Sequence, residues 1–206
     1  MCAHFIVIPR DELERMIADI RETLRAEKRD SIFASYEHAF PKKQVPVILD
    51  ESRQQGDESK FLIRDMVWGY PVHWQKDVVF NTKMETALGS KPSMWDDSIK
   101  NRRCIIPTYG FFEPHMTDTH LSPKTGKPVK DKYFFHYPDS DVVWMAGVYQ
   151  ENNFSIMTTN PNQWISTIHR RMPVVLRSNE LETWLYGDYP NLANRSEIEL
   201  VSSKVA

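Results

Sequence analysis

Cysteine is scarce in this 206-residue sequence, which contains only Cys2 and Cys104. Two cysteines cannot build the disulfide framework of a small secreted protein, so stability must come from an apolar core. Hydrophobic residues make up 41% of the chain, which is enough for one sizeable core at this length. We expect both cysteines to remain thiols in a reducing compartment.

Long apolar runs and a surplus of positive charge are also missing. No stretch approaches the roughly 20 apolar residues that cross a bilayer. The start, MCAHFIVIPRDELER, lacks the basic lead and longer apolar stretch of a signal peptide, so we expect a cytoplasmic protein without membrane contact. Lys and Arg number 26 against 28 Asp and Glu, a formal net charge of −2. Proteins that coat nucleic acid are usually basic, so any DNA site here must be a local patch.

The sequence contains neither a glycine-rich phosphate loop nor residues at metal-ligand spacing, which predicts no cofactor and no metal. No repeat, low-complexity tract or linker divides it, so we expect a single domain over residues 1–206. Short apolar and aromatic runs between turn signals predict strands at 3–8, 45–49, 61–67, 103–107, 132–137, 142–149 and 153–159.

Helical spacing and start signals predict helices at 11–28, 82–89, 161–168 and 179–186. The segment 115–131, which contains lysine, proline and glycine, predicts a mobile loop. The fold class is therefore α+β: a twisted, largely antiparallel sheet that curls toward a barrel, with surrounding helices.

Cys2 stands at the position where removal of the initiating Met would make it N-terminal. The resulting α-amine has a pKa of about 7.7–8, against about 10.4 for Lys, so much of it is unprotonated at neutral pH. That amine can form a Schiff base with an aldehyde, and the neighbouring thiol can then close a five-membered thiazolidine ring. The alternative is a small hydrophobic residue packed at the start of a strand.

Three further residues are candidates for acid–base work or for positioning. His169 exchanges protons near neutral pH and is followed by two arginines. Glu113 follows two phenylalanines, an apolar setting that raises the pKa of a carboxyl group. Asn81 lies where a strand gives way to a helix. The structural alternatives are a hydrogen-bonded histidine, a carboxylate exposed at a strand end and a helix N-cap, respectively.

Aromatic and basic residues suggest contacts with nucleic acid. The motif WGYPVHW, at 68–74, holds two tryptophans and a tyrosine. Unpaired bases stack on such rings, an interaction worth about 1–3 kcal/mol per base. Basic residues at 42–43, 100–103 and 169–171 supply local positive charge for phosphates. Core tryptophans and solvated charges are the alternatives.

Taken in order, these segments resemble the abasic-site processing family, also called the SOS-response-associated peptidase family. IHRRMPV and RCIIPTYGFFE are the more specific signals. The match spans nearly the whole chain through Met1–Cys2, WGYPVHW, FNTKMET, RRCIIPTYGFFE, MAGVY, FSIMTT and IHRRMPVVL. The resemblance implies an α+β fold around a twisted β-barrel, with a groove for single-stranded DNA.

The resemblance also implies that the chain captures abasic sites covalently, and shields them, during the DNA damage response. Met1 would be removed, and Cys2 would form the thiazolidine with the open aldehyde of the abasic sugar. His169 would act at the sugar oxygen, Glu113 would manage protons at the amine, and Asn81 would hold the Cys2 end. The residues expected to contact DNA are Lys83, Trp68, Arg171 and Arg103. We expect a monomer whose partner is single-stranded DNA.

Some positions depart from the family's usual pattern. Ala3 and His4 stand where Gly-Arg is common, and Lys83 replaces an arginine, which substitutes a point charge for bidentate phosphate binding. Pro71 lies one position early, and Pro114 replaces a common Trp. These changes affect the expected DNA affinity more than the crosslinking chemistry.

Two other functions stay open at this level. In one, Cys2 is the nucleophile of an N-terminal-cysteine peptidase that acts on its own Met1 or on peptides, with its amine as the base. In the other, the chain reads single-stranded DNA without covalent chemistry, and Cys2 is dispensable.

Overall fold

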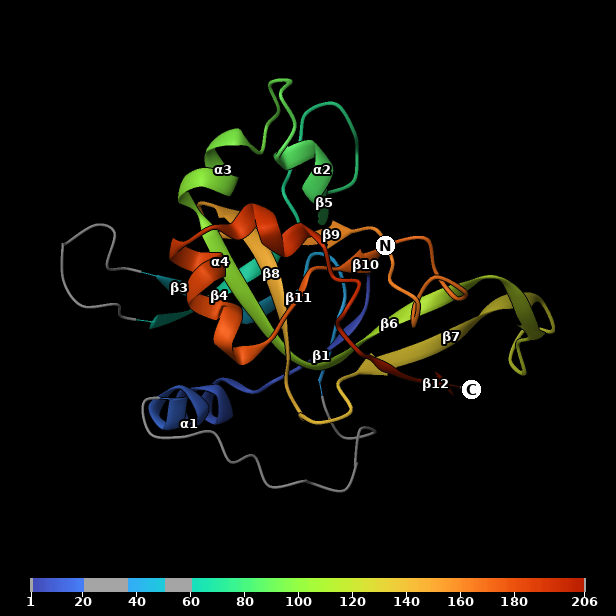
Figure 1. The fold of residues 1–206 in the computed structure, drawn as a ribbon. Helices are drawn as coiled ribbons and strands as arrows, with labels where there is room; N and C mark the ends of the chain where they lie inside the picture. The colour runs from blue at the N-terminus through green and yellow to red at the C-terminus, as the bar shows by residue number, and fades with distance from the viewer. Residues whose placement is uncertain (1, 21–36, 51–60, 206) are drawn as a thin grey trace.

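Strands dominate the computed structural model, which describes residues 2–20, 37–50 and 61–205 (Figure 1). The helices are α1 (Arg10–Ile20), α2 (Met84–Ala87), α3 (Asp96–Asn101) and α4 (Leu181–Tyr186), with 3-10 turns at Ser178–Glu180 and Tyr189–Ala193. The strands are β1 (Phe5–Val7), β2 (His38–Ala39), β3 (Gln44–Asp50), β4 (Phe61–Trp68), β5 (Asn81–Lys83), β6 (Arg103–Leu121), β7 (Pro128–His136), β8 (Val143–Gln150), β9 (Asn153–Thr159), β10 (Met172–Pro173), β11 (Val175–Leu176) and β12 (Val201–Val205).

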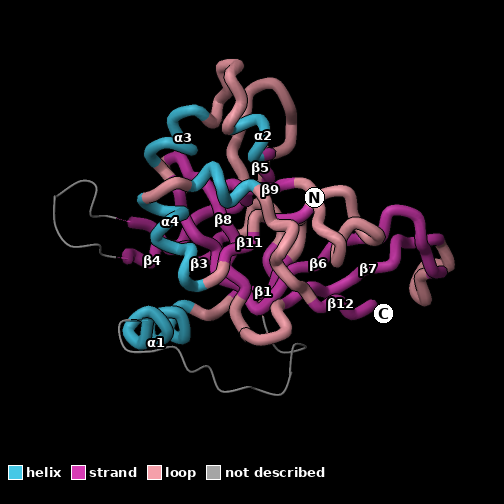
Figure 2. The backbone as a smooth tube through the Cα atoms, in the orientation of Figure 1, coloured by secondary structure: helices cyan, strands magenta, loops and turns pink. Residues whose placement is uncertain are grey.

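The sheet is largely antiparallel, as the sequence predicts. Among the described residues, only the pairings of β9 with β4 and with β5 are parallel. The strand order runs β11-β8-β9-β4-β3-β6-β1-β2, and β8 also pairs with β6, so the ladders join β8, β9, β4, β3 and β6 in a ring. Because β5, β7, β10 and β12 pair outside this path, the result is a sheet ring with extensions and not a simple barrel. Figure 2 shows the helices around this central sheet.

Apolar side chains cover both faces of the sheet. Along β1, Phe5 and Val7 belong to one buried cluster, whereas Ile6 belongs to another that also receives Trp184 of α4. This alternation follows from the period of two residues along a strand. The first of these clusters contains Cys2 together with Met172 of β10, so Cys2 packs on that face of the sheet.

Two predicted elements are wrong. Residues 161–168 form turns and not a helix, because the Asn162 side chain accepts from the backbone of Trp164 and donates to the carbonyls of Arg195 and Ile198. Such bonds compete with the helical backbone pattern. The segment 115–131 is not a loop. β6 continues to Leu121 and β7 begins at Pro128, so the two strands form the long hairpin that projects in Figure 1.

Other boundaries shift. The helix predicted at 11–28 is α1 as far as Ile20, and the rest lies outside the described residues. The helix predicted at 82–89 is shorter, because β5 occupies its start and α2 covers only Met84–Ala87. The sequence did not predict α3 or β12, and β12 pairs along β7. No helix among the described residues is long and apolar enough to span a membrane.

Candidate active site

Antiparallel pairing of β1 with β6 brings the N-terminal residues beside Glu113. Phe5 pairs with Phe111, and the Phe112 backbone N–H donates to the His4 carbonyl oxygen over 2.9 Å. Cys2 is fully buried, with its Sγ 3.9 Å from the same His4 oxygen. Burial raises the pKa of the Cys2 thiol well above its ordinary value, and the negative charge of Glu113 raises it further. The thiol is therefore protonated at neutral pH.

Asn81 holds the main chain of Cys2 directly. Its Nδ2 donates to the Cys2 carbonyl oxygen over 2.8 Å. Asn81 opens β5, which runs parallel to β9 with Asn81 opposite Ile156, so the sheet fixes its backbone. The N-cap alternative is wrong, because α2 begins at Met84 and Lys83 occupies the cap position without a capping side-chain bond. The sheet, not the helix, places this amide at the N-terminus.

Glu113 is a fully buried carboxyl group on β6. Burial raises its pKa from 4.5 to about 7, so the group exchanges protons near neutral pH. The β6–β7 register shifts between Pro114 and Thr119, directly after this residue, and such irregularities bend a strand locally. The alternative of an exposed carboxylate at a strand end is therefore wrong.

His169 faces Glu113 from the segment that leads into β10. Its Nδ1 lies 3.6 Å from Glu113 Oε2 and 2.9 Å from the Arg171 carbonyl oxygen. Partial burial lowers the pKa of the imidazole, which is therefore mostly neutral at pH 7. The Met116 backbone N–H donates to the Ile168 carbonyl oxygen over 2.9 Å, which ties this segment to β6. The four residues predicted as catalytic thus converge on one region from separate parts of the chain.

Two of the predicted DNA contacts are structural. Trp68 is fully buried, and its indole N–H donates to the Phe80 carbonyl oxygen over 2.8 Å. Arg103 is 5% exposed, and its guanidinium lies over the Tyr189 ring. It donates to the backbone carbonyls of Ile99, Lys100, Trp184 and Leu185. Neither side chain is accessible to DNA, so both assignments are wrong.

The exposed ring of the WGYPVHW motif is Trp74, which is 57% exposed. It lies in the loop closed by the bridge between Tyr70 and Val79. Gly69 starts this loop with φ +118°, and a Cβ there would meet Val78 Cγ2 at 2.4 Å, so only glycine fits. The motif signals aromatic rings, but not which of its two tryptophans faces solvent.

The other two predicted DNA contacts differ in their surroundings. Lys83 is exposed at the end of β5, two residues after Asn81. Arg171 is largely covered and makes a bidentate ion pair with Glu85 of α2, with N–O distances of 3.0 and 2.8 Å. No local sequence pattern indicates this role for Glu85, because its partner Arg171 lies 86 residues further along the chain.

His4 carries no charge near neutral pH. Its ring stacks between Phe40 and Phe112, at centroid distances of 4.4 and 4.0 Å, and its Nε2 lies 2.6 Å from His38 Nδ1. Burial, with Lys132 and His38 nearby, lowers the pKa of His4 to about 4. The positive charge that an arginine would place at this position is therefore missing, as the sequence predicts.

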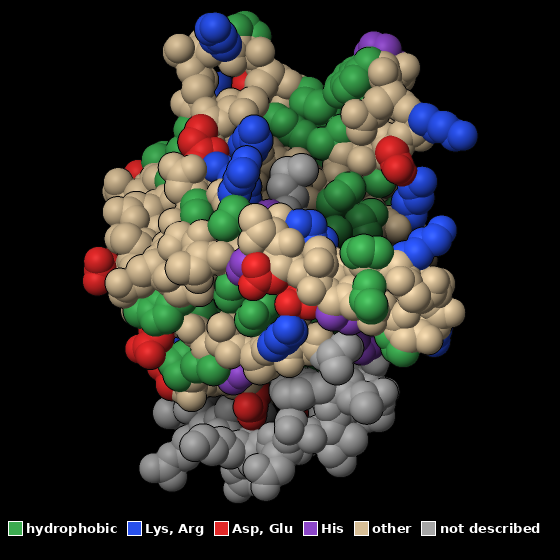
Figure 3. All heavy atoms as spheres, turned by 90° about the vertical axis from the view of Figure 1, so that its right-hand side faces the viewer, with side chains coloured by type: hydrophobic (Ala, Val, Ile, Leu, Met, Phe, Trp, Pro, Cys, Tyr) green, Lys and Arg blue, Asp and Glu red, His purple; other side chains and the backbone are tan. Residues whose placement is uncertain are grey.

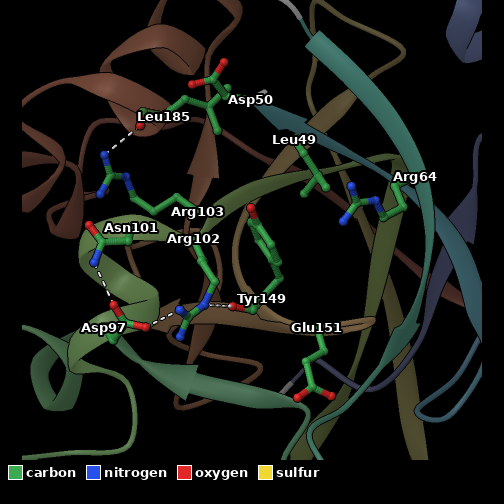
Figure 4. A pocket seen from close by; sticks show the side chains of 10 residues that line it. All are labelled: Leu49, Asp50, Arg64, Asp97, Asn101, Arg102, Arg103, Tyr149, Glu151 and Leu185. Carbon is green, nitrogen blue, oxygen red and sulfur yellow. Dashed lines mark hydrogen bonds and ion pairs between the residues drawn. The ribbon is translucent and has the colours of Figure 1, made fainter. Parts of the chain in front are cut away.

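A cavity of about 670 Å³ lies elsewhere (Figure 4). Its lining includes none of the four residues predicted as catalytic, which are Cys2, Asn81, Glu113 and His169. Three of its charged groups bond to their surroundings: Arg102 pairs with Asp97 and donates to the Tyr149 carbonyl oxygen, and Arg103 donates to the Leu185 carbonyl oxygen. We assign this cavity no ligand.

Comparison with known proteins identifies a family and relatives. The model of the family described as SOS response associated peptidase (SRAP) matches residues 1–204. Abasic site processing protein YoqW of Bacillus subtilis is 32% identical over 142 residues, covering 63% of this chain and 59% of that protein. Abasic site processing protein HMCES of Gallus gallus is 26% identical over 200 residues, covering 78% and 56%. The chain thus spans less than two thirds of the length of these relatives.

Solved structures agree on the fold. A crystal structure of a Bordetella bronchiseptica protein has a TM-score of 0.67 at 18% identity, covering all of both chains. One from Bacteroides thetaiotaomicron has a TM-score of 0.66 at 19% identity, covering 100% of this chain and 92% of that one. The family match extends over almost the entire sequence and includes all four converging residues, so the chain belongs to the SOS response associated peptidase (SRAP) family.

Proposed function

We propose that this protein captures abasic sites in single-stranded DNA by forming a covalent thiazolidine at Cys2, after Met1 has been removed. The convergence of Cys2, Asn81, Glu113 and His169 carries the proposal. The names of the relatives, which are abasic site processing proteins, support the same substrate.

The reaction requires proton transfers that these residues are suited to make. An abasic sugar must first open from its hemiacetal to an aldehyde, and the largely neutral His169 can move the proton that this step requires. The Cys2 amine then adds to C1′ of the aldehyde. Loss of water from the adduct gives the Schiff base. Glu113, with a pKa of about 7, can protonate the departing hydroxyl.

Ring closure completes the crosslink. The Cys2 thiol adds to the carbon of the Schiff base, forming the C–S bond while its proton passes to the nitrogen. No oxidant or reductant is needed. Asn81 restrains the Cys2 carbonyl during these steps, which limits the geometries in which the amine and the thiol meet the same carbon.

DNA would reach the site over a surface with local positive charge. Figure 3 views the molecule from the side toward which the β6–β7 hairpin extends. Hydrophobic side chains line a hollow between two projections at the top, and Lys and Arg side chains lie around it. Exposed Trp74 and Lys83 offer a ring for base stacking and a charge for a phosphate. Such a patch is compatible with the net charge of −2.

The test uses a single-stranded oligonucleotide with one abasic site, followed by a denaturing gel. We expect a shifted band from wild type and none from Cys2→Ala. Cys104→Ala is the matched control, because Cys104 is also a buried free thiol but lies in the core of β6, and it should crosslink normally. Intact mass should show that Met1 is absent from active protein.

Other outcomes separate the alternatives. No band from wild type would refute covalent capture, and a band that survives Cys2→Ala would refute the thiazolidine, because the crosslink would then form without the Cys2 thiol. Salt-dependent DNA binding without a band would favour the non-covalent reader. Peptide turnover that Cys2→Ala abolishes, again without a band, would favour the peptidase.

A further inference from the structure

The side chain of Arg171 is tied into the protein by three partners. Both terminal nitrogens engage the Glu85 carboxylate, over 3.0 and 2.8 Å. The guanidinium also donates to the Thr158 carbonyl oxygen over 2.8 Å and to Asn160 Oδ1 over 3.1 Å. Only 16% of the Arg171 side chain is exposed. A planar guanidinium held by a bidentate carboxylate and two further acceptors has one well-defined orientation.

The backbone of the same residue contacts the imidazole of His169. The Arg171 carbonyl oxygen lies 2.9 Å from His169 Nδ1, whereas the Arg171 backbone N–H is 3.3 Å from the same atom. The shorter contact favours a proton on Nδ1 that is donated to the carbonyl, which leaves the lone pair on Nε2. The position of the Arg171 backbone thus selects the tautomer of His169.

Glu85 connects this segment to the other half of the site. It lies in the first turn of α2, directly after β5, which begins with Asn81. The Glu85–Arg171 ion pair therefore connects the element that holds Cys2 through Asn81 with the segment that carries His169. Arg171 follows His169 by only two residues. A movement of the Arg171 side chain should therefore also displace the Arg171 carbonyl oxygen that contacts His169 Nδ1.

We propose that Glu85 is a positioning residue: by clamping Arg171, it fixes the orientation and tautomer of His169 relative to Cys2. The inference rests on the crosslinking function proposed above. It also gives Arg171, which the sequence suggested as a phosphate contact, a role inside the site. Glu85 itself need not touch DNA.

The test compares Glu85→Gln with wild type, because Gln keeps the shape and removes the charge. Crosslinking rates are measured against DNA concentration at several pH values. We expect the rate at saturating DNA to fall roughly tenfold to a hundredfold, as small misplacements of a reacting group do. The half-saturating DNA concentration should change less than about twofold. The melting temperature of each variant is measured alongside.

The pH profile distinguishes positioning from general loosening. The hydrogen bond to the Arg171 carbonyl raises the pKa of His169, so its loss should lower that pKa. The acidic limb of the rate profile should then move to lower pH in Glu85→Gln. Asp139→Asn is the matched control, because Asp139 pairs with Arg177 in an exposed ion pair with N–O 2.9 Å that contacts none of the four catalytic residues. It should leave rate and profile unchanged.

Three results would overturn the inference. They are an unchanged saturating rate, a loss explained entirely by a higher half-saturating concentration, and a slower rate with an unmoved acidic limb. The second would return Arg171 to phosphate binding. Failure of the proposed function itself looks different, because wild type would then give no crosslinked band at any DNA concentration.

Discussion

Replacing Glu113 with Gln should make the protein more stable above neutral pH while it disables the chemistry. Glu113 is fully buried, and burial raises its pKa from 4.5 to about 7. Between these values the native state binds more protons than the unfolded state, so the stability of wild type falls as pH rises. One pKa unit corresponds to about 1.4 kcal/mol, so the total loss is about 3 kcal/mol by pH 8. Gln does not ionise and escapes this loss.

The assay is urea unfolding of both proteins from pH 4.5 to pH 9. The difference in unfolding free energy should grow in favour of Glu113→Gln through this window and level off above about pH 7.5. The slope is the diagnostic quantity, because a fixed offset from repacking the amide does not depend on pH. Glu182→Gln, an exposed glutamate on α4, should show no comparable slope. Parallel curves for Glu113→Gln and wild type would refute the reasoning about burial.

Three further substitutions test individual assignments. His169→Ala should slow crosslinking with DNA binding nearly unchanged; an unaltered rate would remove His169 from its role. Trp74→Ala should weaken binding to single-stranded DNA by about 1–3 kcal/mol, measured by DNA titration, with little change in stability. Trp68→Ala should instead lower the free energy of unfolding by about 3–5 kcal/mol, measured by urea unfolding. Arg103→Lys should lower the free energy of unfolding by about 2–3 kcal/mol, because an ammonium cannot satisfy four backbone carbonyls. The DNA affinity of the folded variant should stay intact, and a reduced affinity would contradict the structural role of Arg103.

The four residues proposed as catalytic could be singled out from sequence because each lies in a motif, and the structure brings these motifs together. Glu113 follows an apolar run that forms the buried part of β6, so local composition correctly indicated a buried carboxyl group. His169 was found by its motif, although the helix predicted before it is a set of turns. The contact between them, at 3.6 Å, depends on pairing that is distant in sequence and was available only through the family resemblance.

Which aromatic and basic side chains are exposed was harder to predict, because exposure is a tertiary property. Trp68 ends β4 and points into the core, whereas Trp74 lies six residues later in a loop. The sequence suggested that Arg103 is a surface charge. In the structure α4 supplies backbone carbonyl acceptors for its guanidinium. The segment 115–131 contains lysine, proline and glycine, and this local composition indicated a loop. The hairpin instead depends on a contact distant in sequence, because β12 pairs with β7, about 70 residues earlier in the chain.

The surroundings of Cys2 also determine which of its two nucleophiles acts first. A thiol that attacks first must ionise, and burial together with Glu113 opposes that by raising its pKa. The α-amine, with an ordinary pKa of about 7.7–8, is already partly neutral. The proposed crosslink should therefore begin with the amine, and Cys2→Ser, which keeps the amine, should still form a Schiff base. Borohydride should trap that species on abasic DNA at a rate close to wild type, and it should do so only in protein that has lost Met1. If Cys2→Ser with a free N-terminus traps nothing while wild type crosslinks, the thiol attacks first, and the protonated thiol inferred from its burial is not the reacting form.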